Sequence, residues 1–218
     1  GRPRRLVACG LPASRRPHQV IGMSGARSRE HAGTPTAADA AQALDLRQFR
    51  HALGRFATGI TVITTSTPDG KREGLTANSF GAVSLEPPLV LWSLRQDAMS
   101  LPSFRQGRYF AVNVLASHQR SLSNHFARPA PDKFEKVRWR PGLGDCPTLP
   151  DCLALFECRT ERTIEAGDHV LFIGRVERFE WRAGDPLVFS CGHYCLTATL
   201  PEHPRADIAP SDFADLML

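Results

Sequence analysis

Apolar residues recur every three or four positions in the segment that begins at Asp45. They are Leu46, Phe49, Leu53 and Phe56. This spacing places the four side chains on one face of an α-helix. Asp45 is a suitable N-cap residue, and Gly59 lies beyond the end of the pattern. The pattern therefore predicts an amphipathic helix at the start of the folded part of the chain.

The rest of the chain predicts mostly short strands. Runs of β-branched and apolar residues indicate one strand in 59–67, two in 74–94, one in 109–116, two in 153–181 and a closing strand in 186–197. Pro68-Asp69-Gly70 and Gly167-Asp168 are turn signals, and Pro87-Pro88 stands where a strand begins.

A second helix is predicted in 117–128, capped by Ser117, with Leu122 and Phe126 facing inward. Residues 129–151 are rich in Pro and Gly and predict a long excursion. The total is about seven strands and two main helices, which do not alternate regularly. This arrangement favours a mainly β fold, an antiparallel barrel with a few flanking helices, over a doubly wound parallel sheet.

One stretch fits this pattern poorly. Thr76, Ala77, Asn78 and Ser79 stand where a strand is expected, yet they are small or polar, and Asn is depleted in strands. The apolar run 89–94 that follows is typical of a buried strand. A polar segment beside a buried sheet raises the question of what its side chains bind.

The length of 218 residues suits one domain with extensions. We expect a disordered arm over residues 1–40, because it is rich in Arg, Pro, Gly and Ser, then a folded domain over 41–200 and a tail over 201–218. Arg4-Arg5 hints at a twin-arginine or lipoprotein signal, but the apolar part after it is shorter than the ~7–15 residues that such a signal needs. Met23 is a candidate start.

The charge is unevenly distributed along the chain. The total is +5, but residues 1–30 carry +6, which leaves the remainder at −1. The folded part therefore has no basic footprint for nucleic acid. No apolar stretch approaches the ~18 residues of a membrane helix, so we expect neither a nucleic-acid nor a membrane partner.

The six cysteines do not predict a disulfide framework, because a chain of this size can bury a core without one. Cys191, His193 and Cys195 have a spacing that zinc ligands can have. Alternation along one strand explains the same spacing, and no paired ligands with short spacing occur elsewhere. We therefore predict no metal.

Motifs for several kinds of chemistry are missing from the sequence. Neither a dinucleotide-binding G-x-G-x-x-G, a phosphate-binding P-loop, a G-x-S-x-G elbow nor an H-E-x-x-H is present. A nucleotide would have to bind without a glycine-rich helix turn. The residues and motifs alone therefore predict only a β-rich domain with a polar strand segment.

The order of several segments adds more. "LGRFATGITVITT", "GLTANSFGAVSLEPPLVLWSL", "YFAVNVLASHQRSLSNHFA", "DKFEKVRW", "AGDHVLFIGRV" and "PLVFSCGHY" occur in the order found in the short-chain flavin reductases. The resemblance runs from about Leu46 to about Leu196. It implies the FMN-binding split-barrel fold, a Greek-key-like antiparallel barrel.

The resemblance also implies an activity. Such proteins use NADH or NADPH to reduce FMN or FAD, often for a separate monooxygenase, and they are typically homodimers with the flavin near the subunit interface. We accordingly expect a cytoplasmic NAD(P)H:flavin oxidoreductase. Two alternatives stay open, namely a flavin-binding protein without reductase turnover and a flavoenzyme that reduces another acceptor directly.

Carried over residue by residue, the resemblance implies that Thr76, Ala77, Asn78 and Ser79 line the isoalloxazine. Further implied cofactor contacts are Ser84, Ser93 at the start of the loop after a strand, and Ser100 near the flavin phosphate. Ala98 departs from the family pattern, which has a hydroxyl residue there, and Arg95 is a candidate to compensate for it.

Four other positions complete the implied site. His169 in "GDH" is implied to contact the nicotinamide as the catalytic residue, with Asp168 fixing the turn. Asn113 is expected to bond either the flavin or the backbone. Tyr194 either flanks the flavin ring or is a core aromatic residue.

Overall fold

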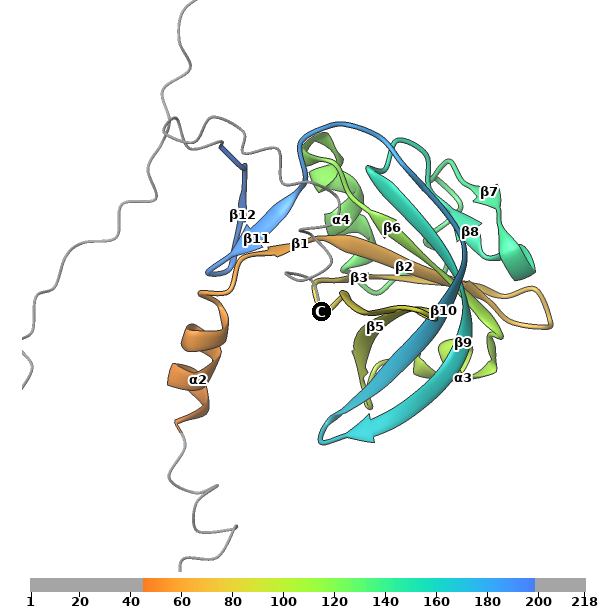
Figure 1. The fold of residues 1–218 in the computed structure, drawn as a ribbon, viewed down its shortest axis with the longest axis horizontal. Coiled ribbons are helices and arrows are strands. Elements are labelled where there is room, and N and C mark those ends of the chain that lie inside the picture. The colour runs from red at the N-terminus through yellow and green to blue at the C-terminus, as the bar shows by residue number, and fades with distance from the viewer. Residues whose placement is uncertain (1–44, 199–218) are drawn as a thin grey trace, which may run out of the picture. The chain divides into compact units, whose positions relative to one another are not determined.

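The computed structural model describes residues 45–198 of the chain. The predicted arm at 1–40 and the predicted tail at 201–218 lie outside this range. The described residues form strands for the most part, with a few short helices beside them (Figure 1). This confirms the mainly β prediction.

Helix α2, Leu46–Leu53, begins at the predicted residue. The Asp45 carboxylate accepts hydrogen bonds from the backbone N–H groups of Arg47 and Gln48, at 2.9 and 3.2 Å, as an N-cap residue does. The helix is shorter than the pattern suggested, because it ends at Gly54 and leaves Phe56 beyond it. Its apolar face buries no residue within the described chain.

Seven strands form the main antiparallel sheet. Their bounds are β2 Thr61–Ser66, β3 Arg72–Ala77, β4 Gly81–Leu85, β5 Pro88–Arg95, β6 Tyr109–Val114, β9 Ala154–Ala166 and β10 His169–Trp181. They are arranged in the order β3-β2-β6-β9-β10-β5-β4. The two longest, β9 and β10, pair around the predicted turn at Gly167-Asp168.

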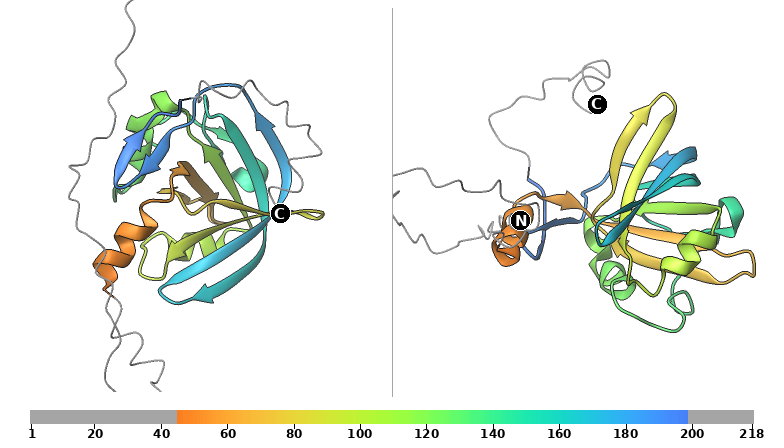
Figure 2. Two further views of the ribbon diagram at one scale, coloured as in Figure 1. Left: turned by 60° about the vertical axis from the view of Figure 1, so that its left-hand side comes forward. Right: turned by 90° about the horizontal axis from the view of Figure 1, so that it is seen from below.

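The sheet has to curl, because its two edge strands are neighbours in the sequence. In a flat sheet, β3 and β4 would lie six strand spacings apart, about 29 Å. The connection from Ala77 to Gly81 spans at most ~14 Å when fully extended. The sheet therefore closes into a barrel whose edges β3 and β4 do not pair with each other, as Figures 1 and 2 show.

Aromatic residues fill the barrel. Trp92 on β5 is fully buried and stacks on Phe172 of β10, with ring centroids 4.6 Å apart. Phe104 and Phe110 approach the Trp92 ring edge-on, at 4.9 and 5.9 Å. Gly174 leaves room for this packing, since a Cβ atom there would lie 2.3 Å from Phe110.

Strand β2 separates this core from a second one. All six residues of β2 are buried. Ile63 packs in the aromatic core, whereas Val62 belongs to an outer cluster with Phe126 and Phe134. Because successive strand residues point to opposite faces, β2 is covered on both sides.

Short helices flank the sheet. The chain has α3 at Leu101–Gln106, which the sequence did not predict, a 3₁₀ turn η1 at Ser117–Gln119, and α4 at Arg120–Phe126. The residue at the N-cap of η1 is Ala116, so the assignment of Ser117 as a cap was wrong. Phe126 is buried, as predicted. The predicted excursion contains β7 Arg140–Pro141, η2 Leu143–Asp145 and β8 Pro147–Thr148.

The predicted closing strand is instead a small hairpin in a separate sheet. Strands β1 Thr58–Gly59, β11 Val188–Ser190 and β12 His193–Cys195 pair in the order β1-β11-β12. Cys191 and Gly192 form the turn between β11 and β12, so Cys191 and His193 are not neighbours on one strand. The Cys191 N–H donates to the Gly54 carbonyl, which ties the hairpin to the end of α2 (Figure 2).

Candidate functional site

A hollow of about 660 Å³ lies over β3. Its walls come from the start and middle of β3, the connection between β5 and α3, and the segment 126–133. Two of the predicted cofactor residues, Thr76 and Ser100, line it. Leu75 and Leu94 give it apolar surface. This volume lies within the usual range for small-molecule sites.

Three basic side chains line the same hollow, namely Lys71, Arg128 and Lys133. The Lys133 ammonium donates to the carbonyls of Gly74 and Phe126, at 2.8 and 3.1 Å. Partial burial lowers the pKa of Lys133, and the nearby charge of Glu73 acts in the opposite direction. The sequence analysis did not select Lys133 or Arg128, although "DKF" was among the family segments. Together these cations suit a phosphate group.

The hydroxyls at the hollow differ in their availability. The Thr76 hydroxyl donates to the Ser123 carbonyl at 2.6 Å, so it anchors β3 to α4. Ser100 occupies the N-cap position of α3, but its side chain makes no capping hydrogen bond. Ser100 therefore stays a candidate for the predicted phosphate contact.

The rest of the polar stretch connects the two edge strands. Strand β3 ends at Ala77, so Asn78 and Ser79 lie in the connection to β4 and not in a strand, which corrects the prediction. Ala77 is buried, and its carbonyl accepts from the Thr61 hydroxyl. Asn78 is exposed.

Ser79 and Ser93 bind each other. The Ser79 hydroxyl donates to the Ser93 carbonyl at 3.1 Å and accepts from the Ser93 N–H at 3.0 Å. Ser93 lies within β5, not at the start of a loop, so that part of the prediction was wrong. Ser84 is in β4, at an irregularity in its pairing with β5. None of these three side chains lines the hollow.

Asn113 belongs to the fold. It is fully buried on β6, its amide nitrogen donates to the Val62 carbonyl at 3.0 Å, and its amide oxygen accepts from the Leu149 N–H at 2.8 Å. Of the two roles left open by the sequence, the structure places this side chain on the backbone.

Tyr194 lies on β12 and points its hydroxyl at α4. The hydroxyl is 2.9 Å from the Ser123 hydroxyl and donates to the Asn124 amide oxygen at 3.0 Å. Its ring packs edge-on against Phe189 at 5.5 Å. Since Ser123 also accepts from Thr76, Tyr194 connects to the hollow through α4.

Asp168 and His169 lie at the turn between β9 and β10. His169 Nδ1 is 2.8 Å from the Asp168 carboxylate, and this hydrogen bond and the imidazole charge lower the pKa of Asp168. In the strand register, His169 faces Arg95 and Val170 faces Leu94, which lines the hollow. The imidazole is 40% exposed, so a ligand has access to it.

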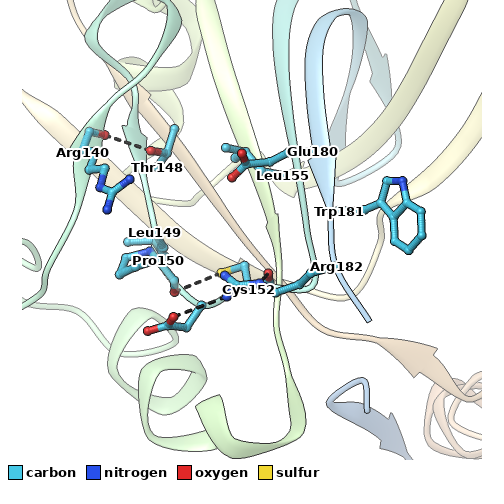
Figure 3. A pocket seen from close by; sticks show the side chains of 10 residues that line it. Arg140, Thr148, Leu149, Pro150, Cys152, Leu155, Glu180, Trp181 and Arg182 are labelled. Atoms are coloured by element: carbon cyan, nitrogen blue, oxygen red, sulfur yellow. Dashed lines mark hydrogen bonds and ion pairs between the residues drawn. The ribbon is translucent and has the colours of Figure 1, made fainter. Parts of the chain in front are cut away.

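A second hollow, of about 360 Å³, contains none of the predicted residues. It is lined by side chains from β7, β8, the segment 149–152 and the end of β10 (Figure 3). The Arg182 guanidinium at its edge donates to the Cys152 carbonyl and lies 3.4 Å from the Asp151 carboxylate. Because the hollow over β3 combines predicted hydroxyls with cations, we take that hollow as the candidate site.

Known proteins are similar to this chain in sequence and in fold. The model of the flavin reductase like domain matches residues 53–198. This chain belongs to the flavin reductase-like family. The strand-rich architecture is accordingly the split barrel that the sequence predicted.

Individual relatives are similar over most of the described range. The chain is 45% identical over 148 residues to the FMN reductase (NADH) SmoA of Agrobacterium fabrum, covering 68% of this chain and 84% of that one. It is 47% identical over 154 residues to a probable flavin reductase of Rhizobium meliloti, covering 71% of this chain and 50% of the relative. The chain therefore spans half the length of that protein.

Solved structures agree with this assignment. The flavin reductase PheA2 is 42% identical, with a TM-score of 0.66, and covers 72% of this chain and 100% of its own. The NADH:FAD oxidoreductase SgcE6 of Streptomyces globisporus, solved with NAD and FAD fragments, is 36% identical with a TM-score of 0.68. That match covers 75% of this chain and 96% of SgcE6.

The roles of two asparagines can be separated by mutation. Asn113→Ala leaves the buried Leu149 N–H without its acceptor and removes a donor to the Val62 carbonyl, so we expect a loss of about 1–3 kcal/mol in the free energy of unfolding. Exposed Asn78→Ala should change it by no more than about 0.5 kcal/mol. Urea denaturation measures both values. Flavin titration of the folded variants should show weaker binding for Asn78→Ala alone. Weaker flavin binding for Asn113→Ala alone would instead make Asn113 the flavin contact.

Proposed function

We propose that this protein is an NAD(P)H-dependent flavin reductase whose reduced flavin serves a separate monooxygenase. One observation supports this most directly. In a chain of the flavin reductase-like family, the hollow over β3 brings Ser100 and Thr76 together with Lys71, Arg128 and Lys133. Hydroxyls, cations and apolar walls match a molecule that has both a flat ring system and a phosphate.

The residues of the hollow fit FMN or FAD. The Ser100 hydroxyl, which makes no capping hydrogen bond, and the three cations of the lining suit the phosphate. Asn78, exposed beside the end of β3, is the polar side chain most available to the ring edge. When bound, the flavin supplies the redox chemistry by accepting a hydride at N5.

The reaction places few chemical demands on the side chains. Hydride passes from C4 of the nicotinamide to the flavin, so the protein only has to hold the reacting atoms ~3–3.5 Å apart. This agrees with the missing nucleophile motifs in the sequence. The proposed work of the chain is binding, orientation and exclusion of water.

His169 is the proposed contact for the nicotinamide. Its Nδ1 is bonded to Asp168, which leaves Nε2 for the carboxamide of the dinucleotide. Asp168 fixes the orientation of the imidazole as well as forming the turn. The proposal includes NADH and NADPH as hydride donors and FMN and FAD as flavins.

The names of relatives support the pathway role. The chain is 41% identical to HsaB of Rhodococcus jostii, named a flavin-dependent monooxygenase reductase subunit. We extend that role to this chain, with its own monooxygenase as partner, and place the enzyme in the cytoplasm. Among residues 45–198, no helix has the length and apolar character to cross a membrane.

A turnover assay tests the proposal. Full-length protein mixed with NADH or NADPH and excess free FMN or FAD should consume the nicotinamide, followed by its absorbance, at a rate that saturates with added flavin. No consumption above the uncatalysed rate would disprove reductase activity. A rate that requires bound flavin but never depends on added flavin would favour direct reduction of another acceptor.

His169 can be tested in the same assay. His169→Ala should lower kcat/KM for the nicotinamide by about tenfold, the scale of one lost hydrogen bond. The dissociation constant for flavin, measured by fluorescence, should not change. His118→Ala, at an exposed position on η1, is the matched control. Equal weakening of nicotinamide use and of flavin binding would contradict the assigned role.

We infer that the protein is a homodimer that uses α2. Leu46, Phe49 and Leu53 are 62%, 46% and 58% exposed, although they lie on one apolar helix face. Burying such a face against a second copy removes apolar surface from water. The tie between Cys191 and Gly54 positions α2 beside the β11–β12 hairpin.

The association can be tested by placing a charge on this face. Wild-type protein should have twice the chain mass in light scattering after gel filtration. Leu53→Asp should yield the single-chain mass, because it would bury an unpaired carboxylate. Gln48→Asp adds the same charge on the polar side of α2 and should stay dimeric. A monomeric wild type, or equal effects of both variants, would rule out the α2 interface.

A further inference from the structure

A third hollow, of about 520 Å³, lies at the other side of the β2–β3 hairpin. Its walls come from the end of β2, the β2–β3 turn, the start of β6 and the segment 139–145. None of the predicted flavin residues lines it. Four side chains give it its chemistry, namely Arg72, Arg108, Tyr109 and Trp139.

Each arginine lies over an aromatic ring. The Arg72 guanidinium is 4.3 Å from the centre of the Trp139 ring, and that of Arg108 is 5.7 Å from the centre of the Tyr109 ring. A guanidinium stacked on a ring keeps its in-plane N–H groups for a planar anion. Neither arginine forms an ion pair with a carboxylate of residues 45–198.

The aromatic walls are held in place. The Trp139 ring packs edge-on against the buried Phe134, with centroids 6.3 Å apart. Gly144 has φ +58° and packs on Tyr109 so closely that a Cβ atom would lie 2.5 Å from its ring. Because these side chains are already held in place, few of them lose conformational freedom when a ligand binds. The entropic cost of binding is therefore lower.

We propose that this hollow binds a small aromatic carboxylate. The two guanidinium groups hold the carboxylate, and Trp139 and Tyr109 contact the ring. Charge favours a monoanion over a phosphate, because Asp145 is also among the lining residues and reduces the two positive charges of the arginines to one. The volume is sufficient for a single substituted ring.

This site is separate from the candidate flavin site, although the two share a wall. Lys71 and Glu73 line the flavin hollow, whereas Arg72 between them lines this one. Successive residues of a strand point to opposite faces, so the start of β3 separates the two hollows. The proposal does not depend on reductase activity.

The three tryptophans of the chain provide a direct test. Trp92 is buried in the barrel, Trp181 is exposed on β10, and Trp139 lines the hollow. In ¹⁵N-labelled full-length protein, benzoate should shift the indole N–H resonance of Trp139 with a saturating dependence on concentration. The signals of Trp92 and Trp181 should stay in place. Trp139→Phe assigns the resonance.

Variants and analogues decide the outcome. Arg72→Gln and Arg108→Gln should each weaken benzoate binding by roughly tenfold, whereas Arg140→Gln, which removes the same charge on β7, should not. An unchanged Trp92 signal shows that each variant is folded. Neutral benzamide and inorganic phosphate should bind more weakly than benzoate. No saturable shift, equal binding of benzamide, or tighter binding of phosphate or AMP would overturn the proposal.

Discussion

The closure of the barrel depends on the short connection between β3 and β4. Six strand spacings separate these edges in the sheet, yet only Asn78, Ser79 and Phe80 join them in the sequence. The Ser79 hydroxyl bonds both backbone groups of Ser93, so the connection is fixed on β5. Phe80 then packs against Phe156 of β9. The polar stretch therefore serves first of all to close the barrel, and Asn78 is the one of its three connecting residues that is exposed.

A second constraint follows from the burial of β2 on both faces. Its threonines send their hydroxyls to carbonyls of neighbouring strands, such as Thr61 to Ala77 and Thr65 to Tyr109. Buried polar groups are costly without partners, so these bonds make a polar strand compatible with two cores. The hydrogen-bond partners of the candidate residues also separate those that serve the fold from those available to a ligand. Asn113 and Ser79 have their polar atoms engaged by the fold, whereas Ser100 keeps its hydroxyl available.

Periodicity predicted the elements well but said little about their partners. Apolar spacing located α2, and turn residues located the β2–β3 and β9–β10 hairpins. The pairs that decide roles are distant in sequence, such as Asn113 with Leu149 and Thr76 with Ser123. No local pattern encodes such contacts. The six-residue helix α3 escaped notice for a related reason, since one and a half turns give too few positions for a periodic signal.

One residue, Gln96, ties the proposed dinucleotide contact to the segment that carries the proposed phosphate contact. Gln96 follows β5, and its side chain donates to the Gly167 carbonyl while its N–H donates to the Asp168 carbonyl. The turn that carries His169 is therefore bound to the connection that leads to Ser100. Hydride transfer requires the nicotinamide and the flavin to be held at a fixed separation. A tie between the proposed dinucleotide contact and the proposed phosphate contact serves that requirement. Because hydride transfer needs positioning and no covalent catalysis, the chain needs neither a nucleophile nor paired carboxylates.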